Sequence, residues 1–438
     1  MYGKGIRMKK DDVRYEAYVN ILKRELVPAM GCTEPVAIAY CAAKARETLG
    51  TLPTRMKVAA SGNIIKNVKS VIVPNTGGQR GIGAAAAAGA LYGDATAKLE
   101  VIAHVEREQI AELADYIEKT PIELEHMESD HVLDMIVTVT NGTHSALVQI
   151  ANEHTNIIRI EKDGELVFSK EDSPKEDRSE TDAKEAEYEL LDVIGIVDFA
   201  ETCDVADVKE ILDRQIAYNT AISEEGLRGS YGANIGKVLL EHFGDSVYIR
   251  ARAKAAAGSD ARMNGCELPV VINSGSGNQG MTVSIPVLEY AKEFGASQEK
   301  TYRALLISNL VTLHEQSGIG RLSAYCGAVS AGAGAGAAIA WLSTDGDLEA
   351  VEHTIVNALA ITSGIVCDGA KSSCAAKISA AVDAGIIGYE MFASGQQFYG
   401  GDGLVAKGVE NSINNFSRLG RIGMKETDKE IIEMMTKN

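Results

Sequence analysis

Apolar residues recur every three to four positions along most of this chain. The period is clear at residues 11–26, at residues 36–50 and in nearly all of the chain after residue 190, and it predicts amphipathic or buried helices. Between them, a Gly-rich loop at residues 74–83 runs into Ala-rich sequence at residues 84–91, which predicts another helix. The pattern therefore favours a mainly helical body.

Between about residues 97 and 170 the pattern changes to the alternation expected of strands. β-branched and other apolar residues alternate with polar ones in the runs 99–105, 131–151 and 156–169. Asn-Gly and Asp-Gly pairs, which favour tight hairpin turns, fall within the last two runs. A helical pattern at residues 107–119 interrupts the strands. We therefore expect an antiparallel sheet accompanied by one helix.

These two patterns together predict an α+β fold with two domains. Residues 1–95 and 190–438 would form the large, mainly helical domain, and residues 96–189 a smaller, inserted antiparallel domain of the α/β-sandwich kind. Residues 170–187 are charged and nearly free of large apolar side chains, so we assign them to a solvated linker.

Composition and charge exclude several classes of partner. The chain is 45% hydrophobic, which suffices for a large core, and its formal net charge of -18 opposes binding to nucleic acid or to anionic membranes. The longest uncharged run, residues 324–342, consists of small residues and predicts a closely packed buried helix rather than a membrane span. The first residues are polar and resemble no signal peptide. We expect a cytoplasmic protein.

The cysteines fall into two groups. Cys41, Cys203 and Cys266 lie in sequence typical of a protein core. The three thiols of Cys326, Cys367 and Cys374 lie instead in Gly-, Ala- and Ser-rich segments, and the spacing within CDGAKSSC fits neither a zinc ribbon nor a ferredoxin. Three thiolates can hold an iron–sulfur cubane and leave one iron open as a Lewis acid. Three buried structural cysteines remain the alternative.

Cys32 lies in the turn GCTEP, directly before a predicted helix with a proline in its first turn. A thiol at a helix N-terminus is expected to have a lowered pKa and to exist partly as thiolate. Such a thiolate could be a nucleophile, a general base or a sensor. The alternative is a cysteine that only packs against the start of the helix.

Two similar segments, residues 71–91 and 270–290, each run from β-branched residues through an Asn/Gly/Gln loop into a helix. Two helix N-termini that face one pocket would favour a carboxylate. Neither loop is a Walker A or dinucleotide-binding sequence, and His314 with Glu315 does not form a zinc-protease motif. Two unrelated turns of similar composition remain the alternative to a shared site.

Four segments carry a resemblance to a known family: GCTEPVAIAY, PNTGGQRGIGAAAAAGAL, AGSDARMNGCELPVVINSGSGNQGM, and SAYCGAVSAGAGAGAA followed by GIVCDGAKSSCAAK. In order and composition they resemble the L-cysteine desulfidases, which are related to the α domain of iron–sulfur L-serine dehydratases. The resemblance covers nearly the whole chain. It implies a [4Fe-4S] enzyme that converts L-cysteine to pyruvate, ammonia and hydrogen sulfide without pyridoxal phosphate.

The resemblance also assigns roles to residues. It implies that Cys326, Cys367 and Cys374 bind the cluster within the helical domain, and that Cys32 is the catalytic cysteine. We expect the Cys32 thiolate to remove the α-proton while the open iron binds the departing sulfur. The residues expected to bind substrate are Thr33, Glu34, Asn75, Thr76, Arg80, Asn278 and Gln279.

Two other functions stay open. L-serine dehydration on the same cluster is the first, although the early loop GCTEP differs from the Ser- and His-rich loop of serine dehydratases. A non-catalytic cluster-based sensor is the second, but it would not need the paired Gly/Asn/Gln loops. We expect a homodimer, because symmetric dimers are the commonest assemblies of soluble proteins.

Overall fold

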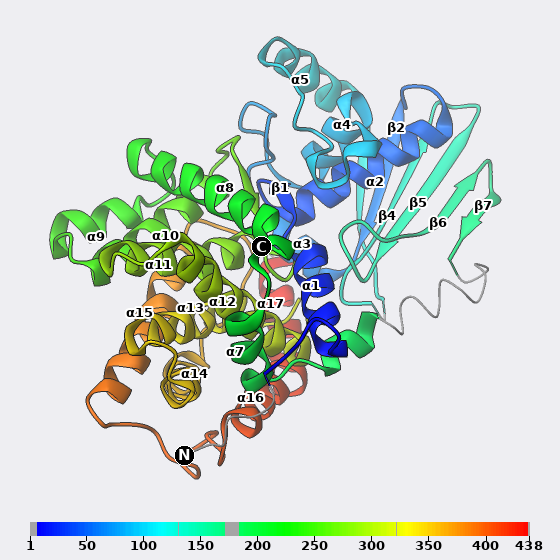
Figure 1. The fold of residues 1–438 in the computed structure, drawn as a ribbon. Helices are drawn as coiled ribbons and strands as arrows, with labels where there is room; N and C mark the ends of the chain where they lie inside the picture. The colour runs from blue at the N-terminus through cyan, green and yellow to red at the C-terminus, as the bar shows by residue number, and fades with distance from the viewer. Residues whose placement is uncertain (1–6, 130, 171–183, 321, 437–438) are drawn as a thin grey trace.

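The computed structural model describes residues 7–129, 131–170, 184–320 and 322–436, and it shows a helical body joined to one six-stranded sheet (Figure 1). The longer helices of the first half are α1 (Val13–Glu25), α2 (Thr33–Leu49), α3 (Gly62–Val68), α4 (Gly81–Tyr92), α5 (Ile110–Lys119), α7 (Val193–Thr202) and α8 (Lys209–Arg228). Those of the second half are α9 (Ile235–Phe243), α10 (Val247–Met263), α11 (Gly277–Glu293), α12 (Gln298–Ile319), α13 (Gly327–Thr344), α14 (Leu348–Thr362), α15 (Cys374–Ala393), α16 (Val409–Arg418) and α17 (Lys425–Thr436).

The large sheet has the strand order β3-β2-β4-β5-β6-β7. Its strands are β2 (Arg55–Ala60), β3 (Ile122–His126), β4 (Asp134–Thr140), β5 (Ser145–Ala151), β6 (Ile157–Lys162) and β7 (Glu165–Ser169). A second, two-stranded sheet pairs β1 (Pro28–Met30) with β8 (Pro269–Val271). The α+β class predicted from the sequence is confirmed.

The large sheet differs from the prediction in one respect, because it is mixed rather than antiparallel. β2 pairs in parallel with β3 and antiparallel with β4. β2 precedes residue 96, so a strand from the first part of the chain lies inside the sheet of the expected inserted unit. Helix α2 also packs against this sheet, where the Cys41 thiol donates a hydrogen bond to the Val148 carbonyl at 3.3 Å. The domain boundaries themselves stay a prediction.

The strand predicted at residues 99–105 is wrong. A 3₁₀ helix, η1 (Ala95–Glu100), and a turn occupy this position, and the Asp94 carboxylate caps η1 by accepting a hydrogen bond from the Thr96 N–H at 2.9 Å. Val101 and Ile102 are both buried, at 1% exposure each. Two consecutive buried side chains do not fit a strand with one solvated face, because side chains alternate between the faces of a strand. The runs 131–151 and 156–169 do form the predicted hairpins.

The helical body is built around close contacts between helices rich in Gly and Ala. Helix α13, which contains most of the uncharged run 324–342, is buried along nearly its whole length. It packs against α12, α14 and α15. Among the described residues, no helix is long and apolar enough to cross a membrane. The prediction of a closely packed buried helix is therefore confirmed.

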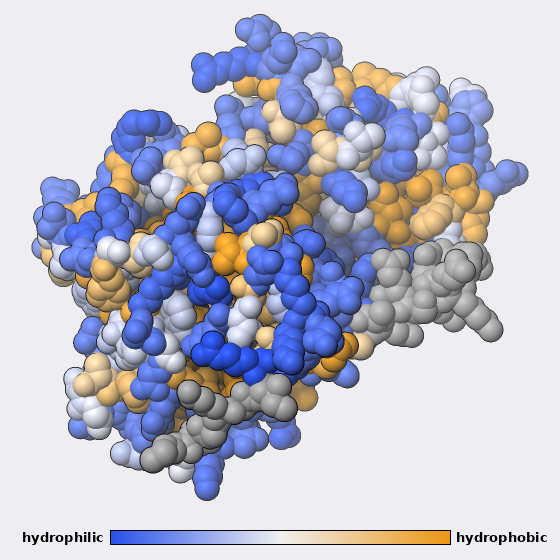
Figure 2. Space-filling view, in the orientation of Figure 1, coloured by the Kyte–Doolittle hydropathy of each residue, from blue (hydrophilic) through white to orange (hydrophobic). Residues whose placement is uncertain are grey.

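Polar side chains cover most of the surface seen in Figure 2, and apolar ones gather over β6 and β7 at the right of the view. Leu166 and Val167 of the edge strand β7 are more than half exposed. The interior of the molecule contains two large apolar clusters, one centred on α2, α4 and the sheet, and the other on α7, α12, α13 and α14.

Candidate functional site

Cys326 and Cys367 lie on two neighbouring backbone segments. The Cys326 N–H donates to the Ile365 carbonyl at 3.1 Å, and the Cys367 N–H donates to the Ala324 carbonyl at 2.6 Å. An antiparallel bridge between Tyr325 and Val366 completes this short ladder. The backbone therefore holds the two cysteines together although they are far apart in sequence.

Each of these segments leads into a helix. Cys326 is the N-cap of α13, and Cys374 is the first residue of α15. Between Cys367 and Cys374 the loop is stabilised by Asp368, which forms ion pairs with Lys371 and Lys377. Two helix N-termini and a lysine thus surround the thiols, an environment that favours negative charge.

The three thiols are free and partly exposed. Burial and the neighbouring Cys367 thiol raise the pKa of Cys326 to about 12, and burial raises the pKa of Cys374. Cys326 interacts electrostatically with both other thiols, so the structure brings the three predicted ligands together. Three crowded thiols lose their protons readily only when a cationic group binds them. Within the described ranges, no group of three His, Cys, Asp or Glu side chains is arranged around a single metal ion.

Cys32 is the N-cap of α2, as predicted, but its thiol does not have the lowered pKa expected at a helix N-terminus. Cys32 is 1% exposed, and burial raises the pKa of its thiol to about 12, although the positive charge of Arg262 acts in the opposite direction. Desolvation thus outweighs both the helix dipole and the nearby guanidinium. The Cys32 Sγ atom lies 3.7 Å from the Met263 Sδ atom, and its thiol interacts electrostatically with Cys374.

Thr33 and Glu34 tie this turn to other elements. The Thr33 hydroxyl donates to the Gly275 carbonyl at 2.9 Å, which joins the GCTEP turn to the loop before α11. The Glu34 carboxylate accepts a hydrogen bond from the Asn67 amide at 3.0 Å. Although burial opposes ionisation, the His154 ring and the charge of Arg262 hold the pKa of Glu34 at about 2. Glu34 is therefore a largely but not fully buried carboxylate, with its side chain 12% exposed and its pKa lowered toward the anion.

Asn278 and Gln279 lie in the first turn of α11, beside the thiols. The Asn278 Nδ2 atom is 3.8 Å from the Met263 Sδ atom, which also contacts Cys32. The Gln279 amide covers Gly327, where a Cβ atom would lie 2.4 Å from Gln279 Nε2. Both residues therefore lie near the cysteines, and substrate binding by them stays a prediction.

Asn75, Thr76 and Arg80 have other surroundings. The Asn75 amide donates to the Ile102 carbonyl at 2.8 Å and so joins its loop to the turn after η1, whereas the Thr76 hydroxyl donates to the Val73 carbonyl at 2.7 Å within the loop itself. This loop packs on the GCTEP turn, since a Cβ atom at Gly31 would lie 2.2 Å from Pro74. Arg80 is exposed and donates to the Ser70 carbonyl at 2.9 Å. Substrate binding by these three residues stays a prediction.

Two residues near the site were not among the predicted ones. His154 lies in the loop between β5 and β6, is 5% exposed, and has its Nε2 atom 3.9 Å from Glu34 Oε1. Arg262, near the end of α10, donates from Nε to the Gly31 carbonyl at 2.8 Å. No local pattern distinguishes His154 in the sequence, whereas Arg262 lies inside one of the segments that carry the family resemblance.

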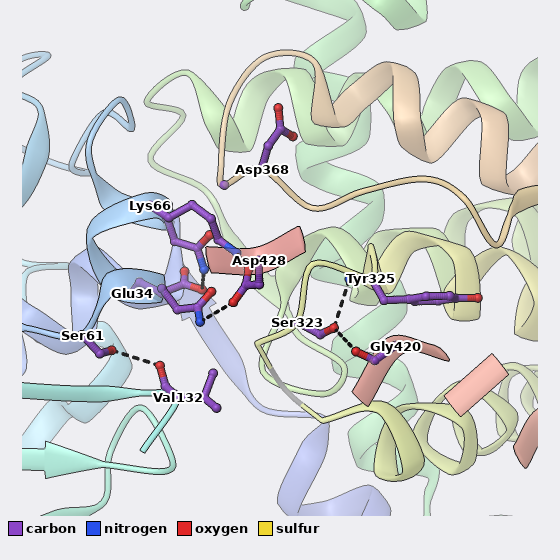
Figure 3. A network of polar contacts seen from close by, with 12 residues as sticks. Glu34, Ser61, Lys66, Val132, Ser323, Tyr325, Asp368, Gly420 and Asp428 are labelled. Carbon is purple, nitrogen blue, oxygen red and sulfur yellow. Dashed lines mark hydrogen bonds and ion pairs between the residues drawn. The ribbon is translucent and has the colours of Figure 1, made fainter. Parts of the chain in front are cut away.

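Helix α3 lies against the loop between Cys367 and Cys374, and α17 packs on α3 (Figure 3). A Cβ atom at Gly369 in this loop would lie 2.3 Å from the Lys66 carbonyl of α3. The Lys66 ammonium in turn forms an ion pair of 2.6 Å with Asp428 of α17, and the Lys66 side chain is only 1% exposed. Asn63 donates to the other Asp428 oxygen at 2.8 Å. α17 therefore holds α3 against the loop between Cys367 and Cys374.

Replacement of Asp428 by alanine is expected to loosen this contact and to cost about 2–3 kcal/mol, because it leaves the Lys66 ammonium buried without its partner. Hydrogen exchange should speed up in α17 and α3, and the midpoint of thermal unfolding should fall. Glu426→Ala is the matched control on the same helix, since the exposed Glu426–Lys429 pair contributes little. Equal exchange rates in the two variants would contradict this role of Asp428.

The family described as serine dehydratase alpha chain matches residues 96–433, a range that includes Cys326, Cys367, Cys374 and Arg262. The chain belongs to this family. Its members are lyase-type enzymes, so the enzyme class predicted from the sequence is supported at this level.

Full-length relatives extend the match to the GCTEP turn. A UPF0597 protein of Desulfitobacterium hafniense is 56% identical over 428 residues, which cover 98% of both chains. UPF0597 proteins of Lachnoclostridium phytofermentans and Treponema denticola are 51% and 44% identical, over 96% and 98% of this chain and 99% and 100% of their own. Their names state no substrate. These matches establish the family of the chain and not its substrate.

Proposed function

We propose that the chain is a [4Fe-4S]-dependent lyase that converts L-cysteine to pyruvate, ammonia and hydrogen sulfide without pyridoxal phosphate. The observation that carries the proposal is the group of three free, mutually interacting thiols of Cys326, Cys367 and Cys374, with Cys32 beside Cys374. In a cubane each thiolate binds a different iron, so the three sulfur atoms need not surround one ion. The helix N-termini and Lys377 fit the negative charge of three thiolates and the cluster sulfides.

When bound, a cluster with one iron free of protein ligands supplies a Lewis acid for the sulfur that leaves Cβ. The chain supplies the base. Cys32 Sγ takes the α-proton, the electron pair of the Cα–H bond forms the Cα–Cβ double bond, and the Cβ–S bond breaks with its electron pair on sulfur. The resulting aminoacrylate tautomerises to an imine, and water hydrolyses the imine to pyruvate and ammonia. The charge of Arg262 lowers the pKa of the Cys32 thiol, and the charge of Glu34 raises it.

The surroundings of Cys32 favour a thiol substrate over an alcohol. The Met263 thioether contacts the Cys32 thiol, so the wall beside the base is soft and apolar. A substrate hydroxyl placed against the Met263 thioether loses its hydrogen bonds to water, whereas a substrate thiol forms only weak hydrogen bonds with water and loses little free energy there. L-serine dehydration is the second candidate, and the name of the family favours it.

The test is the release of sulfide and pyruvate from L-cysteine, compared with pyruvate from L-serine at equal concentration. The protein is purified and reconstituted with iron and sulfide without oxygen. Sulfide and pyruvate in equal amounts, with L-cysteine turned over faster than L-serine, would support the proposal. Faster turnover of L-serine would establish the dehydratase instead, and a stable cluster without turnover of either amino acid would favour a sensor.

The raised pKa of Cys32 leads to a prediction about pH. The thiolate is the active base, and burial raises the pKa of this thiol to about 12, so kcat/KM is expected to rise with pH from 7 to 10 without a plateau. The substrate also titrates in this range, so the quantity to measure is the ratio of wild-type kcat/KM to that of Cys32→Ser. The ratio should increase by several-fold per pH unit. A ratio that is constant or falls with pH would show that Cys32 is not the base.

A further inference from the structure

Arg262 is a buried cation whose charge no acidic side chain pairs directly. It is 3% exposed, and within the part of the chain that the structure describes its one hydrogen bond runs from Nε to the Gly31 carbonyl. Among the ion pairs of the described residues none includes Arg262, although Arg250 and Arg252 of the same helix both have carboxylate partners. A largely buried guanidinium without an ionic partner is costly, because its charge has lost most of its contact with water. A bound anion would offset this cost.

The position of Arg262 is central to the candidate site. Its hydrogen bond to Gly31 places it directly behind Cys32. On the other side it lies against the first residue of α11, since a Cβ atom at Gly277 would be 2.4 Å from the Arg262 Nε atom. Its charge acts on both Cys32 and Glu34. Arg262 thus lies between the base and the N-terminus of α11.

The side-chain oxygens of Asn278 and Gln279, near Arg262, are suited to bind the ammonium group of an amino acid. The Asn278 Oδ1 and Gln279 Oε1 atoms are both buried and have no hydrogen-bond partner. The Gln279 side chain is 6% exposed and covers Gly327, next to Cys326. Carbonyl oxygens of this kind accept hydrogen bonds from an ammonium group. A guanidinium on one side and two free acceptors on the other match the carboxylate and the ammonium of a zwitterion.

We propose that Arg262 binds the α-carboxylate of the substrate, while the side-chain oxygens of Asn278 and Gln279 accept hydrogen bonds from its α-ammonium group. The proposal rests on the proposed function only in taking the substrate to be an α-amino acid. A guanidinium can bind a carboxylate with two parallel hydrogen bonds, which fixes its orientation. Held in this way, the Cα–H bond lies within the region between Arg262, Cys32 and the three thiols. Arg80, expected from the sequence among the substrate-binding residues, is exposed and donates to the Ser70 carbonyl, and substrate binding by it stays a prediction.

The experiment compares ligands that have and lack the carboxylate. Dissociation constants of L-cysteine, L-serine, cysteamine and ethanolamine are measured on the anaerobic holoenzyme by calorimetry, at temperatures where turnover is negligible. The variants are Arg262→Gln and Arg262→Lys. The matched control is Arg252→Gln, which removes a partly buried arginine from the same helix outside the site.

The wild type is expected to bind L-cysteine at least tenfold more tightly than cysteamine. Arg262→Gln should weaken the binding of L-cysteine by about 30-fold, because a charge-assisted pair is lost. Its affinity for cysteamine should stay at the wild-type value. The affinity of Arg262→Lys for L-cysteine should lie between those of the wild type and Arg262→Gln, because lysine keeps the charge but cannot form two parallel hydrogen bonds with a carboxylate. Arg252→Gln should keep the wild-type preference. KM should rise more than kcat falls in Arg262→Lys.

Equal affinity of the wild type for L-cysteine and cysteamine would overturn the proposal, even if Arg262→Gln failed to fold. So would an Arg262→Gln variant that folds and keeps the wild-type preference, or a wild type that binds none of the four ligands. Failure of the proposed function would give a different set of results. An enzyme that prefers carboxylate ligands through Arg262 but turns over only L-serine, or neither amino acid, would retain this inference and reject the desulfidase.

Discussion

Replacement of Cys32 by serine is expected to lower the turnover of L-cysteine by about 10²- to 10⁴-fold while iron and sulfide content stay at the wild-type level. In the proposed arrangement the Cys32 side chain is not a ligand, and its electrostatic interaction with Cys374 places it next to the three-cysteine group. A serine hydroxyl fits the same space and is a far weaker base than a thiolate. The measurements are kcat and the absorbance of the reconstituted cluster.

Cluster content and turnover of Cys326→Ser, compared with those of Cys32→Ser, distinguish a cluster ligand from a catalytic base. That variant is expected to lose both the cluster absorbance and the activity, since the Cys326 thiol interacts with both of the other proposed ligands. Cys203→Ser is the control for loss of a buried thiol, because Cys203 is 2% exposed and belongs to the other apolar cluster. It should keep cluster and turnover. A Cys32→Ser variant that loses its cluster, or one that retains full turnover, would contradict the assigned role.

Much of the fold follows from local pattern. Helices at residues 11–26 and 36–50 and the hairpins of β4 to β7 lie where periodicity and the Asn-Gly and Asp-Gly turns predict them. The parallel pairing of β2 with β3 does not follow in this way, because their partnership depends on contacts between distant segments. Leu99 to Val105 alternated like a strand, yet the capping by Asp94 and the burial of consecutive residues produced a 3₁₀ helix and a turn.

The candidate site shows a similar division. The composition around Cys326, Cys367 and Cys374 suggested a common site, and the family resemblance implied it. The backbone ladder at Tyr325 and Val366 joins the segments of Cys326 and Cys367, and Cys326 interacts electrostatically with Cys374. The protonation of Cys32 could not be predicted, because it depends on how completely the folded chain removes water from the thiol. Arg262 and His154 were missed for a related reason. Both side chains are buried, and both act on the charge of Glu34, and these are properties of the folded chain alone.

The close approach of α13 and α15 leads to the largest expected effect on stability. A Cβ atom at Gly385 of α15 would lie 2.2 Å from the Gly332 carbonyl oxygen of α13, and one at Gly332 would lie 2.3 Å from the Ala381 carbonyl oxygen. These are contacts with backbone, so no side-chain rotation can relieve them. Gly385→Val is therefore expected to push the two helices apart and to lower the free energy of unfolding by about 3 kcal/mol or more.

Displacement of α13 from α15 should weaken binding of the proposed cluster at temperatures where the protein is still folded. Cys326 begins the segment that continues as α13, and Cys374 begins α15, so the distance between these two thiols depends on how the helices pack. Gly385→Val is thus expected to bind less iron than wild type even at temperatures where circular dichroism shows a folded protein. Gly364→Val is the matched control, because Gly364 has no heavy atom within 4 Å of a Cβ position. If Gly385→Val matched this control in both stability and iron content, the packing of α13 on α15 would not be what holds the two cysteines in place.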